Sequence, residues 1–97
     1  MAHYIVLGKF TEQGIKEIRN LPQFVEENIR RGEQMGLKVH GWYLTMGQYD
    51  IAIVVEGPDD ATMSAQAIGV ASRGLSRMET LRAFTLDEAK QIIQRLG

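Results

Sequence analysis

Residues 37–56 read LKVHGWYLTMGQYDIAIVVE and contain two apolar runs separated by a short polar turn. The first run, residues 37–46, and the second, residues 51–56, are rich in β-branched and aromatic residues, which favour strands. Residues 47–50, Gly-Gln-Tyr-Asp, are typical of a turn, since glycine tolerates a positive φ and an Asp side chain can bond its local backbone. This segment therefore predicts a β-hairpin at the centre of the chain.

The residues before the hairpin predict a strand followed by a broken helix. Residues 3–10 form another apolar, β-rich run. Thr11 then offers an N-cap hydroxyl for a helix. Because proline lacks an amide donor, the helix should break at Leu21-Pro22 and a second helical piece should begin there. Gly36 is expected to end that piece.

The residues after the hairpin predict a helix, a strand and a short terminal helix. Residues 57–60, Gly-Pro-Asp-Asp, open the helix, with the glycine as its cap and the proline in first position. Residues 75–84 are expected to form a fourth strand. Thr85 and Glu88 have the spacing of a capping box and begin an amphipathic helix. The chain thus predicts the order β-α-β-β-α-β-α within one domain, residues 1–97.

This order predicts an α+β protein of the ferredoxin-like type, βαββαβ with an extra C-terminal helix. Two split βαβ units with right-handed crossovers give a four-stranded antiparallel sheet with helices on one face. Alternate residues of a strand face opposite sides of the sheet. In the first strand Tyr4 and Val6 share one side, while Ile5 and Leu7 share the other. Both sides of the sheet are therefore apolar.

A doubly apolar sheet needs cover on both faces. The two main helices can cover only one face, and the terminal helix is too short to hide the other. An uncovered apolar sheet of this size exceeds the patches that monomers usually expose. We therefore expect a second copy of the chain to cover it, through a two-fold, sheet-to-sheet interface.

Composition excludes several classes of protein. The 97 residues carry a formal net charge of −1, from 11 Lys+Arg and 12 Asp+Glu, which gives no basic footprint for nucleic acid. The absence of cysteine excludes disulfides, thiol catalysis and cysteine-ligated zinc. No apolar run reaches the roughly 18 residues of a membrane span, and the first residues lack the basic stretch of a signal peptide. We expect a cytoplasmic protein without nucleic-acid or membrane partners.

Residues 43–50, YLTMGQYD, resemble the signature of the GYD-domain family, which is named for its Gly-x-Tyr-Asp segment. Residues 11–15 (TEQGI), 57–60 (GPDD) and 79–85 (ETLRAFT) also resemble parts of that family, so the similarity spans nearly the whole chain. The resemblance implies the dimeric α/β-barrel superfamily, in which two ferredoxin-like sheets face each other. It implies a homodimer or higher oligomer and no particular activity.

Tyr49 and Asp50, in the hairpin turn, are the most specific candidates for a site. In a functional interpretation they gate a ligand at the end of the sheet, Tyr49 donating a hydrogen bond and Asp50 accepting one. In a structural interpretation Asp50 accepts from local backbone and Tyr49 covers the edge of the core. The structural interpretation is favoured, because such turn roles need no ligand.

His40 is the candidate acid–base residue. Strand alternation predicts that it shares a side with Trp42 and Leu44, so it could act in an enclosed cavity if that side meets a second copy. The sequence offers His40 no visible partner, which favours an interfacial histidine bonded to backbone or water. Since His3 is the only other histidine and ligand spacing is lacking, we expect no metal site.

The leading hypothesis is a homo-oligomeric protein that binds a small, partly apolar molecule at or between its sheets, without a cofactor. The apolar contacts would come from Trp42, Tyr43, Met46 and Tyr49, and the polar anchors would be His40, Asp50 and Arg77. The first alternative, by superfamily resemblance, is a cofactor-independent monooxygenase- or isomerase-like enzyme, with His40 or Asp50 as base and Tyr49 as donor. The second alternative is a purely structural or regulatory interaction module.

Overall fold

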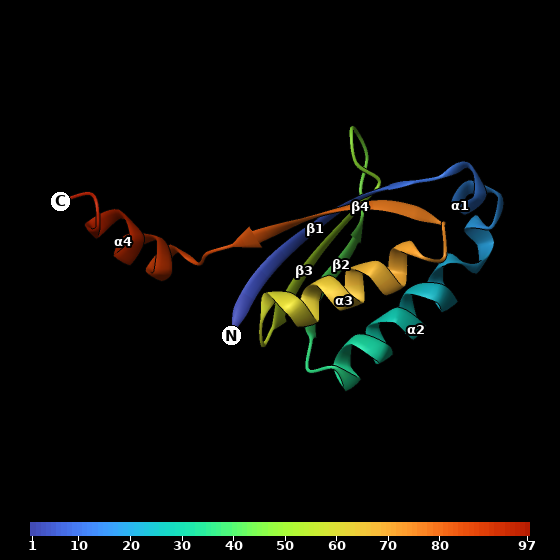
Figure 1. Ribbon diagram of the computed structural model, residues 1–97. Helices are drawn as coiled ribbons and strands as arrows, with labels where there is room; N and C mark the ends of the chain where they lie inside the picture. The colour runs from blue at the N-terminus through green and yellow to red at the C-terminus, as the bar shows by residue number, and fades with distance from the viewer.

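A computed structural model describes residues 1–97 as a four-stranded antiparallel sheet with two long helices against one face (Figure 1). The sheet order is β2-β3-β1-β4, which confirms the predicted ferredoxin-like α+β fold. In chain order the elements are β1 (Ala2–Phe10), α1 (Glu12–Lys16), the short 3-10 helix η1 (Ile18–Asn20), α2 (Leu21–Gln34), β2 (Lys38–Leu44), β3 (Ile51–Gly57), α3 (Asp60–Ala71), β4 (Ser76–Ala83) and α4 (Leu86–Gln94).

Most of the predicted signals for helix ends around α1 and α2 are confirmed. Thr11 accepts a hydrogen bond from the Gly14 amide at 3.0 Å and caps α1. The second helical piece begins at Leu21 as predicted, with proline in its first turn. The first helix, however, already ends at Lys16, and η1 lies between the two. Gly36 follows α2 with φ +89°, a conformation that side chains rarely adopt. The chain can therefore turn sharply there into β2.

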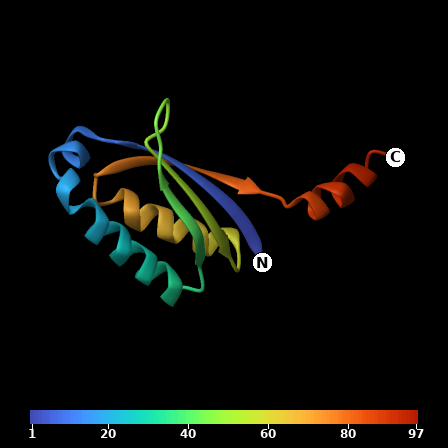
Figure 2. The ribbon, with the colours of Figure 1, turned by 180° about the vertical axis from the view of Figure 1, so that it is seen from behind.

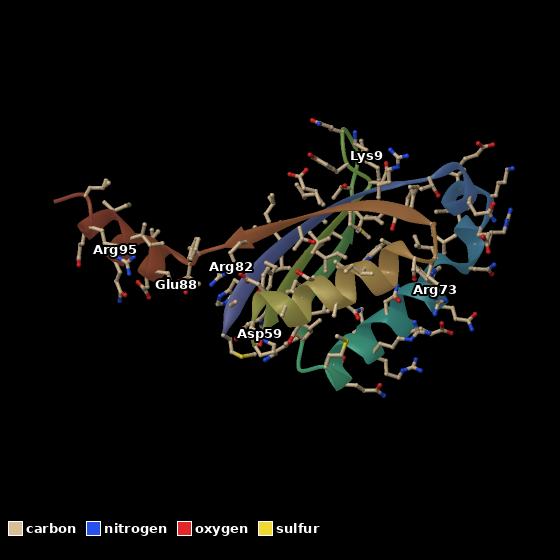
Figure 3. The ribbon with its side chains drawn as sticks, in the orientation of Figure 1. Lys9, Asp59, Arg73, Arg82, Glu88 and Arg95 are labelled. Atoms are coloured by element: carbon tan, nitrogen blue, oxygen red, sulfur yellow. The ribbon has the colours of Figure 1, made fainter.

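The start of α3 differs from the prediction. The sequence favoured Gly57 as the cap, but Asp59 is the N-cap and its carboxylate accepts from the Thr62 amide at 2.8 Å (Figure 3). A carboxylate can satisfy this free amide and a glycine cannot. Hydrogen bonds from the Thr62 side chain and from its amide lower the pKa of Asp59. Gly57 instead ends β3, where an added Cβ would lie 2.4 Å from Leu37.

A bulge in β2 corrects the predicted placement of its side chains. The register with β3 shifts between Val39 and Gly41, so His40 is an extra residue without a pairing partner. His40 reaches Glu56 on the uncovered face of the sheet, whereas Trp42 faces the helices. The prediction that His40 and Trp42 share a side was therefore wrong, since strict alternation does not survive a bulge.

The second face of the sheet has no helix over it, as the two opposite views make plain (Figures 1 and 2). At its centre Ile5 lies beside Val54 of β3 and Leu81 of β4. These three side chains are 38–39% exposed. We call this surface, formed by Ile5, Leu7, Ala52, Val54 and Leu81, the open face.

The terminal helix α4 does not cover the open face either. It projects past the end of β4, clear of α2 and α3 (Figures 1 and 2). No helix of the chain is both long enough and apolar enough to span a bilayer.

Gly14 brings α1 against the start of β4, and this contact yields a stability prediction. A Cβ at Gly14 would lie 2.0 Å from the backbone oxygen of Leu75. Gly14→Ala should therefore lower the free energy of unfolding by about 1–3 kcal/mol, because the backbone must move. Gly69→Ala is the matched control, since nothing lies within 4 Å of its Cβ. That helical site should gain about 0.5–1 kcal/mol. Urea unfolding measures both; equal effects would contradict the account.

Candidate functional site

An apolar cavity of about 240 Å³ lies between the two main helices and the sheet. Most of its walls are hydrocarbon, so it differs from a polar active-site cleft. The sheet contributes Val6, Trp42, Ile51, Ile53, Val55 and Met78, and the helices contribute Phe24, Val25, Ile29, Met63, Ala67 and Val70. The helix α3 is dominated by small residues, which leaves part of the space between the helices and the sheet unfilled.

Ser76 is the notable polar group of this cavity. Its side chain is 7% exposed and its Oγ has no hydrogen-bond partner. A buried hydroxyl without a partner costs about 1–3 kcal/mol, and such a group calls for an explanation. The Gln66 amide nearby is already used, since it donates to the backbone oxygen of Asn28 at 3.0 Å and ties α3 to α2. The Ser76 hydroxyl is therefore available to a polar atom of a bound molecule.

A second, smaller hollow of about 200 Å³ adjoins the first at the other end of α3. Tyr4 donates a hydrogen bond to Asp60 at 2.5 Å, and the Arg82 guanidinium lies 3.5 Å from the same carboxylate. Arg82 also lies 5.7 Å from the centre of the Tyr4 ring. Burial, followed by the bond to Asp60, raises the pKa of Tyr4 to about 12. Tyr4 is therefore a neutral hydrogen-bond donor at ordinary pH.

Two histidines and a glutamate meet on the uncovered side of the sheet. Glu56 Oε1 lies 2.9 Å from His40 Nε2 and 3.7 Å from His3 Nε2. The hydrogen bond from His40 lowers the pKa of Glu56. His3 Nδ1 in turn lies 3.7 Å from Glu88 of α4. No group of three His, Asp or Glu side chains has an arrangement that could hold a metal ion.

The hairpin turn uses its candidate residues within the chain. Asp50 accepts from the Phe10 amide at 3.0 Å, and the Thr45 hydroxyl donates to the backbone oxygen of Tyr49 at 2.6 Å. The Tyr49 hydroxyl donates to Glu79 at 3.3 Å. The turn residues thus tie the hairpin to β1 and β4. The Asp50 carboxylate therefore accepts from a distant strand and not from its own turn, which differs from the local role in the structural interpretation.

The structure separates the residues that the sequence grouped into one site. Trp42 lines the cavity. Tyr43 lies on the uncovered side of the sheet, and Met46 is 97% exposed at the hairpin tip. Arg77 of β4 is exposed beside Lys9 of β1. His40 and Asp50 stand at opposite ends of the sheet, since His40 contacts the end of β3 and Asp50 precedes its start.

Sequence reasoning missed Ser76 and the group formed by Tyr4, Asp60 and Arg82. Ser76 gives no signal, because a serine at a strand end is common and only burial leaves it unpartnered. Tyr4 and Asp60 are 56 residues apart and meet through the crossover. Only a weak signal for this contact is present in the sequence. Tyr4 carries a hydroxyl on a strand side predicted to be apolar, and Asp60 lies among the residues predicted to open a helix.

Comparison with known proteins adds two findings. The family model described as "GYD domain" matches residues 4–93. A curated protein of Thermus thermophilus, named "Glutamine synthetase and cystathionine beta-lyase binding protein", is 33% identical over 85 residues, which cover 87% of this chain and 90% of that protein.

The Tyr4–Asp60 bond predicts a stability loss at high pH. Folding raises the pKa of Tyr4 from 10.0 to about 12. The contribution of neutral Tyr4 to the free energy of unfolding is therefore complete below pH 10 and is lost as the pH rises toward 12. Tyr4→Phe should cost about 1–2 kcal/mol at pH 7 through the missing hydrogen bond, and should flatten the alkaline decline. Urea unfolding from pH 7 to 11.5 measures this. Tyr43→Phe, at an exposed tyrosine, should keep the decline; an unchanged decline in Tyr4→Phe contradicts the assignment.

Proposed function

The chain belongs to the GYD-domain family, and we propose that it is a self-associating binding protein that holds a small, mostly apolar molecule in the cavity between its helices and its sheet. The observation that carries this proposal is the cavity itself, with hydrocarbon walls and the unpartnered Ser76 hydroxyl. Mostly apolar cavities with a few polar groups are the common form of a small-molecule site.

The size and chemistry of the cavity support a ligand rather than water. A closed apolar cavity of about 150 Å³ accepts a benzene-sized molecule, and this cavity, which is partly open to solvent, offers about 240 Å³. A ligand would recover the packing that the empty space lacks. One polar atom on the ligand would also satisfy Ser76 Oγ.

Self-association through the open face is supported by its composition. Ile5, Val54 and Leu81 are exposed in a continuous patch across three strands, and contiguous apolar patches mark interaction surfaces. Charged side chains lie at both ends of the patch and would form a polar rim. A two-fold axis would let the same surface of two copies meet.

A second candidate function is the binding of another protein. The Thermus relative is named for binding two enzymes, and the open face would serve a different protein as readily as a second copy. The enzymatic alternative has less support, because His40 and Asp50 stand at opposite ends of the sheet and each is bonded within the chain.

The ligand proposal predicts that filling the cavity blocks uptake. The probe is 1-N-phenylnaphthylamine, whose fluorescence rises in apolar surroundings. The protein should bind it at a single saturable site, and Ala67→Leu should weaken binding about tenfold or more by occupying the cavity. Ala71→Leu makes the same change on an exposed position of α3 outside the cavity and should leave binding unaltered. Equal binding by both variants, or no saturable binding by the parent protein, would remove the ligand proposal.

The association proposal predicts that a charge at the centre of the open face separates the copies. Sedimentation should give at least twice the chain mass for the parent protein and the single-chain mass for Val54→Lys, since an ammonium group cannot be buried there without a partner. Ile68→Lys, at a 70% exposed residue of α3, should leave the assembly intact. A parent protein that remains monomeric at all concentrations would sink this proposal and favour a different protein as the occupant.

A further inference from the structure

The terminal helix α4 presents an apolar stripe that is largely exposed to solvent. Leu86, Ala89, Ile93 and Leu96 recur at helical spacing along one side of it, with Ile92 beside them. Leu86 is 74% exposed, Ile93 60% and Leu96 83%. A helix of this length is marginal in water by itself. Its stability therefore depends on a surface that covers the stripe.

Local contacts hold α4 away from its own sheet. Only Phe84 and Thr85 separate β4 from α4. The capping box joins Thr85 and Glu88 in both directions, at 2.9 and 3.2 Å. The Arg82 guanidinium lies 4.6 Å from the centre of the Phe84 ring, and Glu88 pairs with His3. A link this short and this well bonded directs α4 outward (Figure 3), so α4 cannot fold back over the open face.

A second unpartnered apolar group lies at the opposite end of the sheet. Near the tip of the β2–β3 hairpin, Met46 is 97% exposed and Tyr43, on the uncovered side of the sheet, is 56% exposed. Leu44 is 66% exposed but pairs with Ile51 and so faces the helix side. The β4 end that carries α4 lies beside His3 at the start of β1. The hairpin tip lies beside Gly8 and Phe10 at the other end of β1, through the bonds that Asp50 makes to both. The stripe and the tip are therefore separated by the whole length of the sheet.

We propose that α4 is an exchanged arm, whose apolar stripe packs on the hairpin tip of a second copy of this chain. If two open faces meet with their strands antiparallel, one two-fold operation brings each arm to the tip of the other copy. The three uncovered apolar surfaces, namely the open face, the stripe and the tip, then form one continuous and self-complementary interface. The inference rests on the self-association proposed above and not on the ligand.

The charges near both ends agree with this pairing. The first turn of α4 carries Asp87, which is 92% exposed and lies 3.8 Å from Lys90, and Glu88, which is already bonded to Thr85. The tip end of the sheet carries Lys9 and Arg77, which are neighbours across β1 and β4 and are exposed. Acidic and basic side chains would therefore meet at the rim of the arm contact, where complementary charge favours one orientation over its reverse.

Disulfide trapping tests the arm directly, because the chain contains no cysteine. Two single-cysteine variants, Ile93→Cys and Met46→Cys, are equilibrated together as intact proteins and mildly oxidised. The arm predicts a reducible cross-linked species that contains one chain of each variant. Gln91→Cys is the matched control, since Gln91 lies on the opposite side of α4 from the stripe. Its cross-linking to Met46→Cys should be at least tenfold lower.

A second measurement keeps the test independent of cross-linking chemistry. Ile93→Glu should weaken self-association about tenfold in sedimentation, while Gln91→Glu should leave it unchanged. A dimer that persists without the Ile93–Met46 cross-link, or that Ile93→Glu does not weaken, would overturn the arm alone. Dominant cross-linking of Ile93→Cys to itself would also overturn it, since that places arm against arm. Binding of phosphatidylcholine vesicles that Ile93→Glu abolishes, with the dimer unaffected, would identify a lipid surface as the occupant instead.

Discussion

The apolar side chains of Ile5, Val54 and Leu81 lie side by side on a face of the sheet that no helix covers, and the rest of the structure depends on this exposed contact. The sheet is apolar on both sides, and α2 and α3 cover only one of them. Apolar surface in water is unfavourable in proportion to its area. Because α4 projects away from the open face, any cover for that surface would have to come from another molecule. All strands and helices of the fold are therefore in place, but one apolar face of the sheet is exposed to solvent.

On the covered side of the sheet, the space beneath the helices is not completely filled by side chains. Tyr4, Val6 and Val55 form a small buried core at one end of the sheet, with Leu37 and Met63 beside them. Most of these core residues also line the cavity, which the helices cover without filling. Protein interiors are usually packed as densely as organic crystals. The unfilled apolar space and the Ser76 hydroxyl without a hydrogen-bond partner are the two observations on which the proposed ligand binding rests.

Polar side chains in this protein serve mainly to join elements. Asp50 ties the hairpin to β1, Asp59 caps α3, and Asp60 links Tyr4 to Arg82. Glu56 gathers His3 and His40, while Glu88 closes the capping box and reaches His3. Each of these five carboxylates is thus bonded within the chain. This pattern favours a binding protein held in a defined shape, and it suits a rigid arm at the end of β4.

The order of elements, the start of α2 at Leu21-Pro22, the Thr85 capping box and the two apolar sides of the sheet follow from the sequence, because propensity, capping and strand alternation are local properties. The bulge at His40 and the cap at Asp59 do not, since both depend on which of several neighbouring groups pairs with a distant strand or a free amide. The residues that the sequence grouped into one candidate site are dispersed in the structure: Trp42 lines the cavity, while Tyr43, Met46, Tyr49 and Arg77 lie elsewhere. Ser76 and the direction of α4 emerge only from tertiary structure. A missing hydrogen bond or an uncovered helix face is a property of everything that surrounds a residue, and local sequence does not encode it.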